Sequence, residues 1–524
     1  MKKEAGIVSA IPSKRLFKSI IADYDLNCAI CELIDNALDI WVKNQGTPKL
    51  KIEINLEKNQ QTIEVIDNSG GIKESELKFL VAPGETSNLP EDKTIGIFGV
   101  GTKRAVVALA QEVKITSRFK NCKTYQLEFD DDWLKDNEWD LPYYVVEDIE
   151  DGKTVIELHK LRIKITDDAL SHLKKHLEAT YARFLNDKNV IIELNSKPLQ
   201  PLTFENWAYP PKYPPHNFVG DLKNEDGKPI KVEILAGLTL ESSPIEGEYG
   251  VYFYCNDRLI IRGLKSYDVG FTAGLAGKAH PRFSICRVIV SLNGEAQLMP
   301  WNSSKSNINT THPIFLALRD MIIHIVTDYA SLCRRWEGEW EEQVFKYTSG
   351  DIVEIKIDSF PNAKKSYLPP LPKSKPRYAD KLKKVNRSIV KEKPWAKGLY
   401  ESIAAVDLIF KQHYEQKNRI CLILLDSTLE IAFKEYLVND SGEPYNDRRL
   451  LELFGNRINV HKEIKKHIKL KSSTWRKVKH YYYLRCKLIH ERATVGLSDS
   501  EIENYREVVQ IVLNKLFKLK FDDL

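Results

Sequence analysis

Three short segments within the first 103 residues constrain this chain more than any other feature, because their residue types, order and spacing fit one pocket. They are residues 32–39 (ELIDNALD), 66–72 (IDNSGGI) and 96–103 (GIFGVGTK). Each segment alone is a modest signal, since polar helix faces, turns and glycine-rich loops are all common. Together they supply an acid–amide pair, a carboxylate at a strand end and a loop able to surround phosphate.

The first segment lies in a stretch with apolar residues at helical spacing, which predicts a helix over residues 27–42. Glu32 and Asn36 are four residues apart and therefore share one face of that helix. A carboxylate can orient and deprotonate a water molecule, and an amide oxygen can hold Mg²⁺ against phosphates. The alternative is a solvated polar face on an amphipathic helix.

The second segment follows an apolar–polar alternation over residues 61–66, which predicts a strand that ends at Asp67. A carboxylate at that point can accept a hydrogen bond from the amino group of adenine. The glycines that follow, Gly71 among them, allow close approach of the backbone to a ligand. The same residues are also ordinary turn formers, so a plain turn is the alternative.

The third segment is rich in glycine and precedes a helix predicted over residues 104–111. Backbone N–H groups at a helix N-terminus attract phosphate, and Lys103 adds a positive charge. The segment lacks both the βαβ context of a dinucleotide site and the Lys-Ser/Thr ending of a P-loop. By itself it is weak support for a phosphate site.

Taken together, the three segments resemble those of the GHKL ATPases, which include DNA gyrase B, the heat-shock chaperone ATPase, sensor kinases, MutL and MORC. The resemblance implies a Bergerat-type α/β sandwich that binds ATP and Mg²⁺. It assigns Glu32 to water activation, Asn36 to Mg²⁺, and Asp67 with Gly71 to adenine.

The resemblance also implies a lid that wraps the triphosphate. Its glycines fall on Gly96, Gly99 and Gly101, followed by Thr102 and Lys103 in the same nucleotide-binding loop. One residue departs from the family pattern, because Ser69 stands at the first glycine of Asp-x-Gly-x-Gly. We therefore expect a tighter or less mobile turn that still permits binding.

Residues after about 200 predict a second α/β domain, with strands at 252–261 and 287–292 and a helix near 313–336. This region resembles the S5-like transducer domain of MutL, gyrase B and especially MORC. In that domain a loop lysine reaches the γ-phosphate, and Lys305 holds the matching position. The alternative is a surface lysine in a polar loop.

A Pro- and Lys-rich stretch over residues 349–393 predicts an extended linker. Its positive charges fit either a solvated tether or an electrostatic grip on nucleic acid. Residues 394–524 predict an all-α bundle. The expected helices are 395–414, 420–437, 475–492 and 499–517.

The third of these helices carries Arg485 and His490, five residues apart. This pair resembles the motif of the HEPN superfamily, which is Arg, four to six residues, then His. The resemblance implies a metal-independent ribonuclease that works as a dimer, with Arg485 on the scissile phosphate and His490 assisting the 2′-hydroxyl. Cys486 departs from the polar residue that often follows the family's arginine.

Basic and aromatic residues alternate around this motif, over residues 456–492. Such a mixture suits single-stranded RNA, whose phosphates bind cations and whose bases stack on rings. A solvated helix face with tyrosines in the core is the alternative.

The 524 residues allow several ordinary domains. No apolar run is long enough for a membrane span, and the N-terminus has no apolar signal core. The eight scattered cysteines fit reduced thiols, so we expect a cytoplasmic protein. The acidic stretch 128–151 predicts a solvated loop. The expected domains are 1–200 (ATPase), 201–348 (transducer), 349–393 (linker) and 394–524 (HEPN-like).

These expectations combine into an ATP-switched dimeric effector, in which a GHKL ATPase controls a HEPN ribonuclease acting on RNA. Such an architecture suggests antiphage defence or another stress response, by association only. The alternative is a MORC-like ATP-dependent clamp on DNA, whose helical domain only dimerises. A chaperone is a third possibility, for which nothing speaks beyond the pocket.

Overall fold

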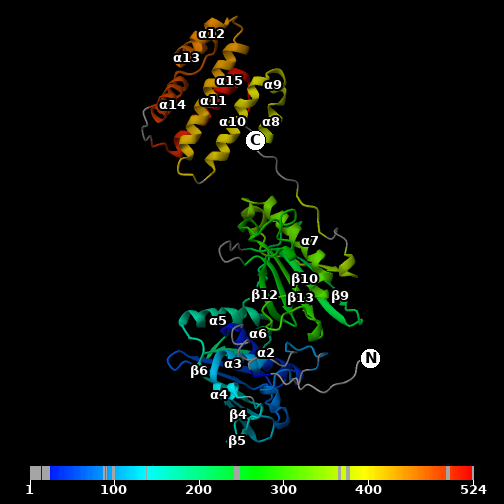
Figure 1. The fold of residues 1–524 in the computed structure, drawn as a ribbon. Helices are drawn as coiled ribbons and strands as arrows, with labels where there is room; N and C mark the ends of the chain where they lie inside the picture. The colour runs from blue at the N-terminus through cyan, green and yellow to red at the C-terminus, as the bar shows by residue number, and fades with distance from the viewer. Residues whose placement is uncertain are drawn as a thin grey trace, which may run out of the picture. The chain divides into compact units, whose positions relative to one another are not determined.

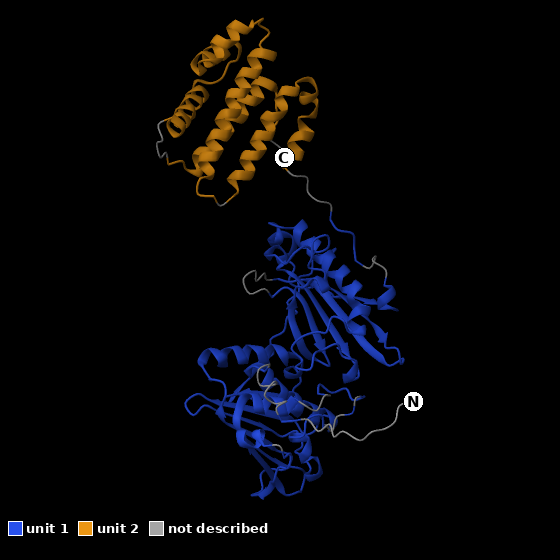
Figure 2. Ribbon diagram, viewed as in Figure 1, with its two compact units in different colours: residues 1–372 blue, residues 373–524 orange. Residues whose placement is uncertain are grey.

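The computed structural model divides the chain into two compact units, residues 1–372 and 373–524 (Figure 2). The structure describes residues 13–14, 24–85, 89, 91–96, 101–136, 138–240, 248–363, 368–372, 378–412, 414–490 and 496–521. Within these residues no helix is long and apolar enough to cross a membrane.

The first unit contains an eight-stranded sheet with the order β5-β4-β3-β6-β2-β1-β7-β8. Its strands are β1 Leu50–Glu57, β2 Thr62–Asp67, β3 Ala110–Arg118, β4 Thr124–Asp130, β5 Tyr143–Val146, β6 Thr154–Leu161, β7 Val190–Leu194 and β8 Lys197–Pro198. Figure 1 labels strands β4, β5 and β6 of this sheet. All neighbours are antiparallel except β1 and β7. Burial alternates along β1 and β7, so one face of the sheet lies against the core.

Helices accompany this sheet and form a common core with it. They are α2 Leu26–Lys43, α3 Gly101–Leu109, α4 Asp131–Lys135, α5 Asp167–Thr180 and α6 Ala182–Leu185. Helix α2 begins where the side chain of Asp25 accepts a hydrogen bond from the N–H of Cys28, which satisfies one N–H of the first turn. It packs beside α3 and α5.

A second, six-stranded sheet in the same unit has the order β12-β11-β13-β10-β9-β14. Its strands are β9 His216–Lys223, β10 Pro229–Leu238, β11 Gly250–Cys255, β12 Arg258–Leu264, β13 Cys286–Asn293 and β14 Val353–Lys356. Helix α7 (Pro313–Arg335) packs on β13 and β10, while an aromatic cluster with Trp207 and Tyr252 fills the other face. Strands β11 and β13 are therefore buried on both faces.

The second unit is helical. Its helices are α8 Tyr378–Val385, α9 Arg387–Glu392, α10 Lys397–Phe410, α11 Lys417–Asn439, α12 Asp447–Phe454, α13 Arg457–His467, α14 Ser472–His490 and α15 Asp499–Phe517. Helix α11 is the central element, since α10, α13, α14 and α15 all pack against it. Leu422, Leu425, Leu429 and Phe433 of this helix are fully buried.

Three expectations from the sequence were wrong in detail. The helix predicted over 104–111 ends at Leu109, because Ala110 already pairs with Leu161 as the first residue of β3. The acidic stretch 128–151 is more than a solvated loop. It completes β4, forms α4 with Asp130 as its N-cap, and supplies β5 as an edge strand.

The predicted linker 349–393 is also mostly structured. Residues 353–356 form β14, which pairs in parallel with β9 and extends the second sheet. Helices α8 and α9 belong to the helical unit, where Leu382 is fully buried in the core. Only the proline-rich part, of which residues 368–372 are described, has no regular secondary structure. Tertiary packing overrides the charged, proline-containing composition on both sides of it.

Candidate active site

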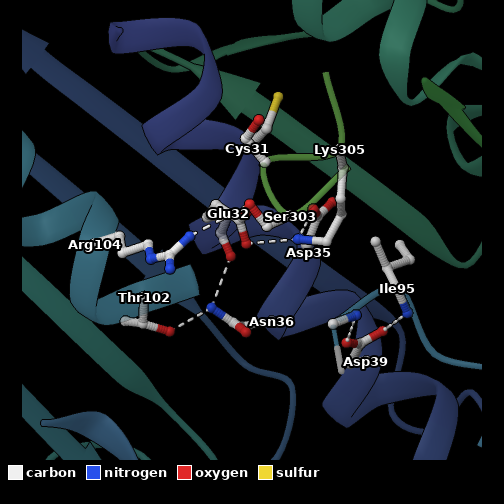
Figure 3. A network of polar contacts seen from close by, with 12 residues as sticks. Cys31, Glu32, Asp35, Asn36, Asp39, Ile95, Thr102, Arg104, Ser303 and Lys305 are labelled. Carbon is white, nitrogen blue, oxygen red and sulfur yellow. Dashed lines mark hydrogen bonds and ion pairs between the residues drawn. The ribbon is translucent and has the colours of Figure 1, made fainter. Parts of the chain in front are cut away.

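Helix α2 turns an unusual number of carboxylates into the protein interior. Glu32, Asp35 and Asp39 are all buried, although charged side chains are almost never fully buried without a partner. Apolar neighbours such as Ile34 and Leu38 pack the helix against the core, so the carboxylates follow at helical spacing along an inner face. Figure 3 shows Glu32 and Asp35 converging with a lysine from the second sheet region, while Asp39 is directed toward Ile95.

That lysine is Lys305, which lies in the loop before α7 and is 3% exposed. Its Nζ is 2.6 Å from Oε2 of Glu32 and 3.2 Å from Oδ2 of Asp35. Its backbone has φ = 50°, a left-handed conformation that costs free energy for a residue with a side chain. Lys305 is therefore a buried, held group and not the surface lysine that was the alternative interpretation.

Two further residues hold Asp35. Arg258, the first residue of β12, donates from Nε to Oδ1 of Asp35 at 2.9 Å and from Nη1 to the carbonyl oxygen of Lys305 at 2.7 Å. The hydroxyl of Tyr181 donates to the same Oδ1 at 2.7 Å and to the carbonyl oxygen of Cys31 at 2.9 Å. Sequence reasoning missed Arg258 and Tyr181 and gave Asp35 no role.

The four charges of this cluster compensate one another. Burial alone would lower the pKa of Lys305, but the carboxylates of Glu32 and Asp35 outweigh it and raise that pKa. The pKa of Arg258 is likewise raised against burial, chiefly by Asp35. Both cations therefore stay charged in the interior, balanced by two carboxylates.

One oxygen of Glu32 remains open. Its Oε1 is buried and has no hydrogen-bond partner among the described residues, whereas Oε2 holds Lys305. The first residue of α3, Gly101, lies so close that a Cβ there would be 2.2 Å from Oε2. A glycine is thus required for the N-terminus of α3, with its N–H groups, to approach this carboxylate.

Asn36 lies one turn after Glu32 on the same helix. Its Nδ2 donates to the carbonyl oxygen of Glu32 at 2.7 Å and to Oγ1 of Thr102 at 2.5 Å. This orientation leaves the amide oxygen available as a ligand for a hard cation. The structure therefore brings Glu32, Asn36, Gly101, Thr102 and Lys305 together, as the sequence predicted.

Asp39 anchors the chain just before the predicted lid. Its two carboxylate oxygens accept hydrogen bonds from the N–H groups of Ile95 and Gly96, each at 2.7 Å. Burial raises the pKa of Asp39 to about 7, against the lowering effect of these two bonds. Gly96 is thereby tied to α2, while Gly99 lies outside the described residues.

Lys103 is directed elsewhere. Its Nζ donates to the carbonyl oxygen of Glu85 at 2.7 Å, and burial lowers its pKa to about 8. The next residue, Arg104, reaches Oγ of Ser303 at 3.5 Å and so connects α3 to the loop of Lys305 (Figure 3). A phosphate role for Lys103 would require its bond to Glu85 to break.

The predicted adenine carboxylate ends β2. Asp67 pairs with Ile52 of β1 and Thr154 of β6, so it lies at the centre of the sheet. Burial raises its pKa, opposed by hydrogen bonds from the hydroxyl and the N–H of Ser69 to Oδ1. Ser69 thus fixes the carboxylate, consistent with the tighter turn that we expected.

Gly71 approaches the protein's own backbone at this turn, and its predicted contact with a ligand stays a prediction. It has φ = 70°, and a Cβ there would lie 1.9 Å from the carbonyl oxygen of Arg118. No other residue type fits that position without a backbone shift.

The helical unit carries the second candidate site. On α14, Nη1 of Arg485 lies 3.5 Å from Nε2 of His490, so the two groups converge despite their offset along the helix. Nε of Arg485 lies 3.5 Å from Oδ2 of the fully buried Asp426 on α11. The same carboxylate receives two bonds from Arg457, at 2.6 and 2.7 Å, and one from the hydroxyl of Tyr505 at 3.0 Å.

The surroundings of this second site are basic and aromatic. The guanidinium of Arg457 lies 4.3 Å from the ring centroid of Tyr482, and His461 contacts both Phe433 and Trp475, whose rings stack on each other. Burial, followed by Arg457 and Lys465, lowers the pKa of His461 to about 4. The exposed cations on α13, α14 and their connection are Lys462, Lys465, Lys466, Lys469, Lys471, Arg476, Lys477 and Lys479.

Comparison with known proteins finds a family match for the part of the chain that contains most of the first site. Residues 24–161 match the family described as histidine kinase-, DNA gyrase B-, and HSP90-like ATPase. No curated protein matches the chain. The matched range contains Glu32, Asn36, Asp67 and Gly101, together with α2, α3 and strands β1 to β6 of the first sheet. The chain therefore carries a GHKL-type ATPase domain at residues 24–161, in an N-terminal part whose mixed α/β sheets fit the GHKL fold and which is followed by a helical C-terminal region.

Proposed function

We propose that the first unit binds ATP with Mg²⁺ and hydrolyses it slowly. The observation that carries this proposal is the buried Glu32, with one oxygen on Lys305 and the other without a partner among the described residues. An orphaned carboxylate oxygen in the interior costs free energy unless it serves a ligand or a water. The position of Gly101 supports the fit, because any side chain there would clash with Oε2 of Glu32.

Each residue then has a defined task. Oε1 of Glu32 orients a water molecule and takes its proton, while Asp67 accepts a hydrogen bond from the adenine amino group. The amide oxygen of Asn36 holds Mg²⁺, which offsets the negative charge of the phosphates. The N-terminus of α3 at Gly101 and Thr102 attracts phosphate through its N–H groups.

Substitution of Asp67 tests the binding part of the proposal. Asp67→Ala should abolish ATP binding in titration calorimetry, because the adenine contact is lost. Asp168→Ala, on the exposed start of α5, is the matched control and should bind as the wild-type protein does. An unchanged affinity of Asp67→Ala for ATP would show that Asp67 does not bind adenine and that the assigned pocket is wrong.

Lys305 couples the nucleotide to the rest of the first unit. We propose that it leaves Glu32 to contact the terminal phosphate, and that the first units of two chains then close into a dimer. A ligand shifts such an equilibrium only if it contacts the two states differently. In this proposal the difference is the contact between Lys305 and the terminal phosphate, which ADP lacks. A non-hydrolysable ATP analogue should favour a compact dimer in X-ray scattering, and identical profiles with ADP would contradict this.

For the second unit we propose RNA cleavage by Arg485 and His490. The favouring observation is their 3.5 Å approach beside the basic surface of α13 and α14. A guanidinium can fork onto two phosphate oxygens, and an imidazole can move the proton of a 2′-hydroxyl. No metal takes part in this chemistry, so it should survive chelation once any ATP-dependent control is bypassed.

An RNA-degradation assay with and without ATP tests this second proposal. Arg485→Ala and His490→Ala should each abolish cleavage while nucleotide binding stays intact. If wild-type protein cleaves no RNA, the result would favour the alternative function, an ATP-dependent DNA clamp whose helical unit only dimerises. A role of the ATP-controlled nuclease in antiphage defence would then also fall, since it rests on the cleavage.

A further inference from the structure

We infer that Arg258 is a positioning residue, which neutralises Asp35 and so keeps Lys305 available to Glu32 and to the terminal phosphate. This inference rests on the proposed ATPase function. It names a residue outside the matched range 24–161, brought to the site only by the fold.

The contacts place Arg258 at the junction of three elements. Through Nε it binds Asp35 on α2, through Nη1 it binds the carbonyl oxygen of Lys305, and its own backbone begins β12. Its side chain is 4% exposed, and that of Asp35 is 1% exposed. One buried guanidinium thus fixes both the carboxylate and the backbone that presents the lysine.

The charges explain why this matters. Lys305 has two carboxylates within reach, at 2.6 Å for Glu32 and 3.2 Å for Asp35. In the interior an uncompensated carboxylate attracts a nearby ammonium strongly. Without Arg258, Asp35 would keep, among the described residues other than Lys305, only the neutral hydroxyl of Tyr181, and it would compete for Lys305. The ammonium would then be held at Asp35 and withheld from a phosphate.

The hairpin that carries Arg258 also touches the start of the lid. Its turn residues Asn256 and Asp257 both have positive φ, 47° and 64°, which sets a tight two-residue connection. The side chain of Asn256 donates to the carbonyl oxygen of Thr94 at 3.1 Å, two residues before Gly96. The same short hairpin therefore contacts the segment tied to Asp39 and the cluster around Lys305.

The test measures affinity, not turnover. For wild-type protein the ratio of the dissociation constants for ADP and for a non-hydrolysable ATP analogue reports the contact of Lys305 with the terminal phosphate. Arg258→Gln should lose most of this ratio and no more than Lys305→Met loses, since it acts through Lys305. Asp35→Asn combined with Arg258→Gln should recover most of the ratio, because the competing charge is gone.

A merely structural role for Arg258 predicts the reverse. The double variant has lost more buried contacts than Arg258→Gln alone. Its ratio of dissociation constants would then be equal to or lower than that of Arg258→Gln. Unfolding of the nucleotide-free protein gives an independent readout. Arg258→Gln should destabilise it through the unpaired Asp35, and the double variant should be more stable than the single one.

Further variants keep the inference testable if Arg258→Gln does not fold. Arg258→Lys retains the charge but loses the two-pronged contact of the guanidinium with Asp35 and the carbonyl oxygen of Lys305. The ratio of dissociation constants should therefore fall less than in Arg258→Gln. In a Lys305→Met background, Arg258→Lys should change the ratio no further, since it acts through Lys305. An unchanged ratio in Arg258→Lys, or an additive loss in that background, overturns the inference. Failure of the wild-type protein to bind the analogue would instead refute the proposed function.

Discussion

Each candidate site is built on one buried aspartate, Asp35 in the first unit and Asp426 in the second. Each accepts from a buried guanidinium and a tyrosine hydroxyl. The partners are Arg258 and Tyr181 for Asp35, and Arg457 and Tyr505 for Asp426. The two sites differ in the group added next. The first adds a carboxylate with one oxygen open, and the second adds a guanidinium, Arg485, that turns toward His490.

This difference separates the chemistries that the two units can perform. An open carboxylate oxygen accepts a proton or a cation, whereas an open guanidinium binds an anion such as phosphate. The supporting aspartate, arginine and tyrosine are alike in both units and specify neither function. Under the proposals above, ATP hydrolysis would depend on Glu32 and RNA cleavage on Arg485.

The largest effect is expected from the group that defines the first site. Glu32→Gln retains the size and polarity of the side chain but removes the base, so turnover of ATP should fall by about 10²-fold or more. Binding of the nucleotide should persist, because the proposed contacts to adenine, Mg²⁺ and the phosphates come from other residues. A phosphate-release assay and a titration measure the two quantities separately.

Glu57→Gln, at the exposed end of β1, is the matched control and should leave turnover unchanged. Equal ATPase rates for wild-type protein and Glu32→Gln would end the assignment of Glu32 as the base. The open carboxylate oxygen of Glu32 would then not define the chemistry of the first unit.

Removal of the supporting aspartate in the second unit should act on stability. Asp426→Ala leaves the buried Arg457 with only Glu430, at 3.2 Å, as a carboxylate partner among the described residues, and should cost up to about 3–5 kcal/mol of unfolding free energy. Urea unfolding followed by far-ultraviolet circular dichroism measures this loss. Asp407→Ala, which breaks a half-buried pair with Arg506, is the control and should cost clearly less. A smaller loss in Asp426→Ala than in the control would show that the second site does not rest on this aspartate.

Acid should act on the two units with opposite sign. The pKa of Asp39 is raised to about 7, so its stabilising contribution is full below pH of about 4 and is lost as pH rises to about 7. The pKa of His461 is lowered to about 4, so its contribution is full above pH of about 6.5 and is lost as pH falls to about 4.

Unfolding at several pH values checks this contrast against two variants. Relative to wild-type protein, His461→Gln should be less dependent on pH between 6.5 and 4, and Asp39→Asn should change the slope in the opposite direction. If the two variants change the slope in the same direction, the two units do not differ in how acid affects their stability.

The smallest expected effect separates function from stability in the second unit. Arg485 is partly exposed and adds only a long contact to a carboxylate that Arg457 already satisfies. Arg485→Ala should therefore change the unfolding free energy by no more than about 0.5 kcal/mol while abolishing RNA cleavage. A large loss of stability would identify Arg485 as a structural residue.

Local patterns were sufficient for several elements. Apolar spacing predicted residues 27–42 and 499–517 as helices, and the structure has α2 at Leu26–Lys43 and α15 at Asp499–Phe517. The strand that ends at Asp67 was confirmed as well. In each case the signal lies in neighbouring residues, which the sequence shows directly.

Long-range partners could not be predicted in this way. Arg258 binds Asp35 across 223 residues of sequence, and nothing near Arg258 distinguishes it from other arginines in strands. Strand β14 was mistaken for linker because its residues look solvated until β9 pairs with them. Such contacts depend on how sheets and loops come together, and a local pattern carries no record of that.

The most direct test of the account is a nucleotide titration of wild-type protein and Lys305→Met under identical conditions. We predict that the wild-type protein binds a non-hydrolysable ATP analogue more tightly than ADP, by a factor of about 5–150, and that Lys305→Met loses most of this preference. Equal affinities of the wild-type protein for the two nucleotides, or an undiminished preference in Lys305→Met, would contradict the account.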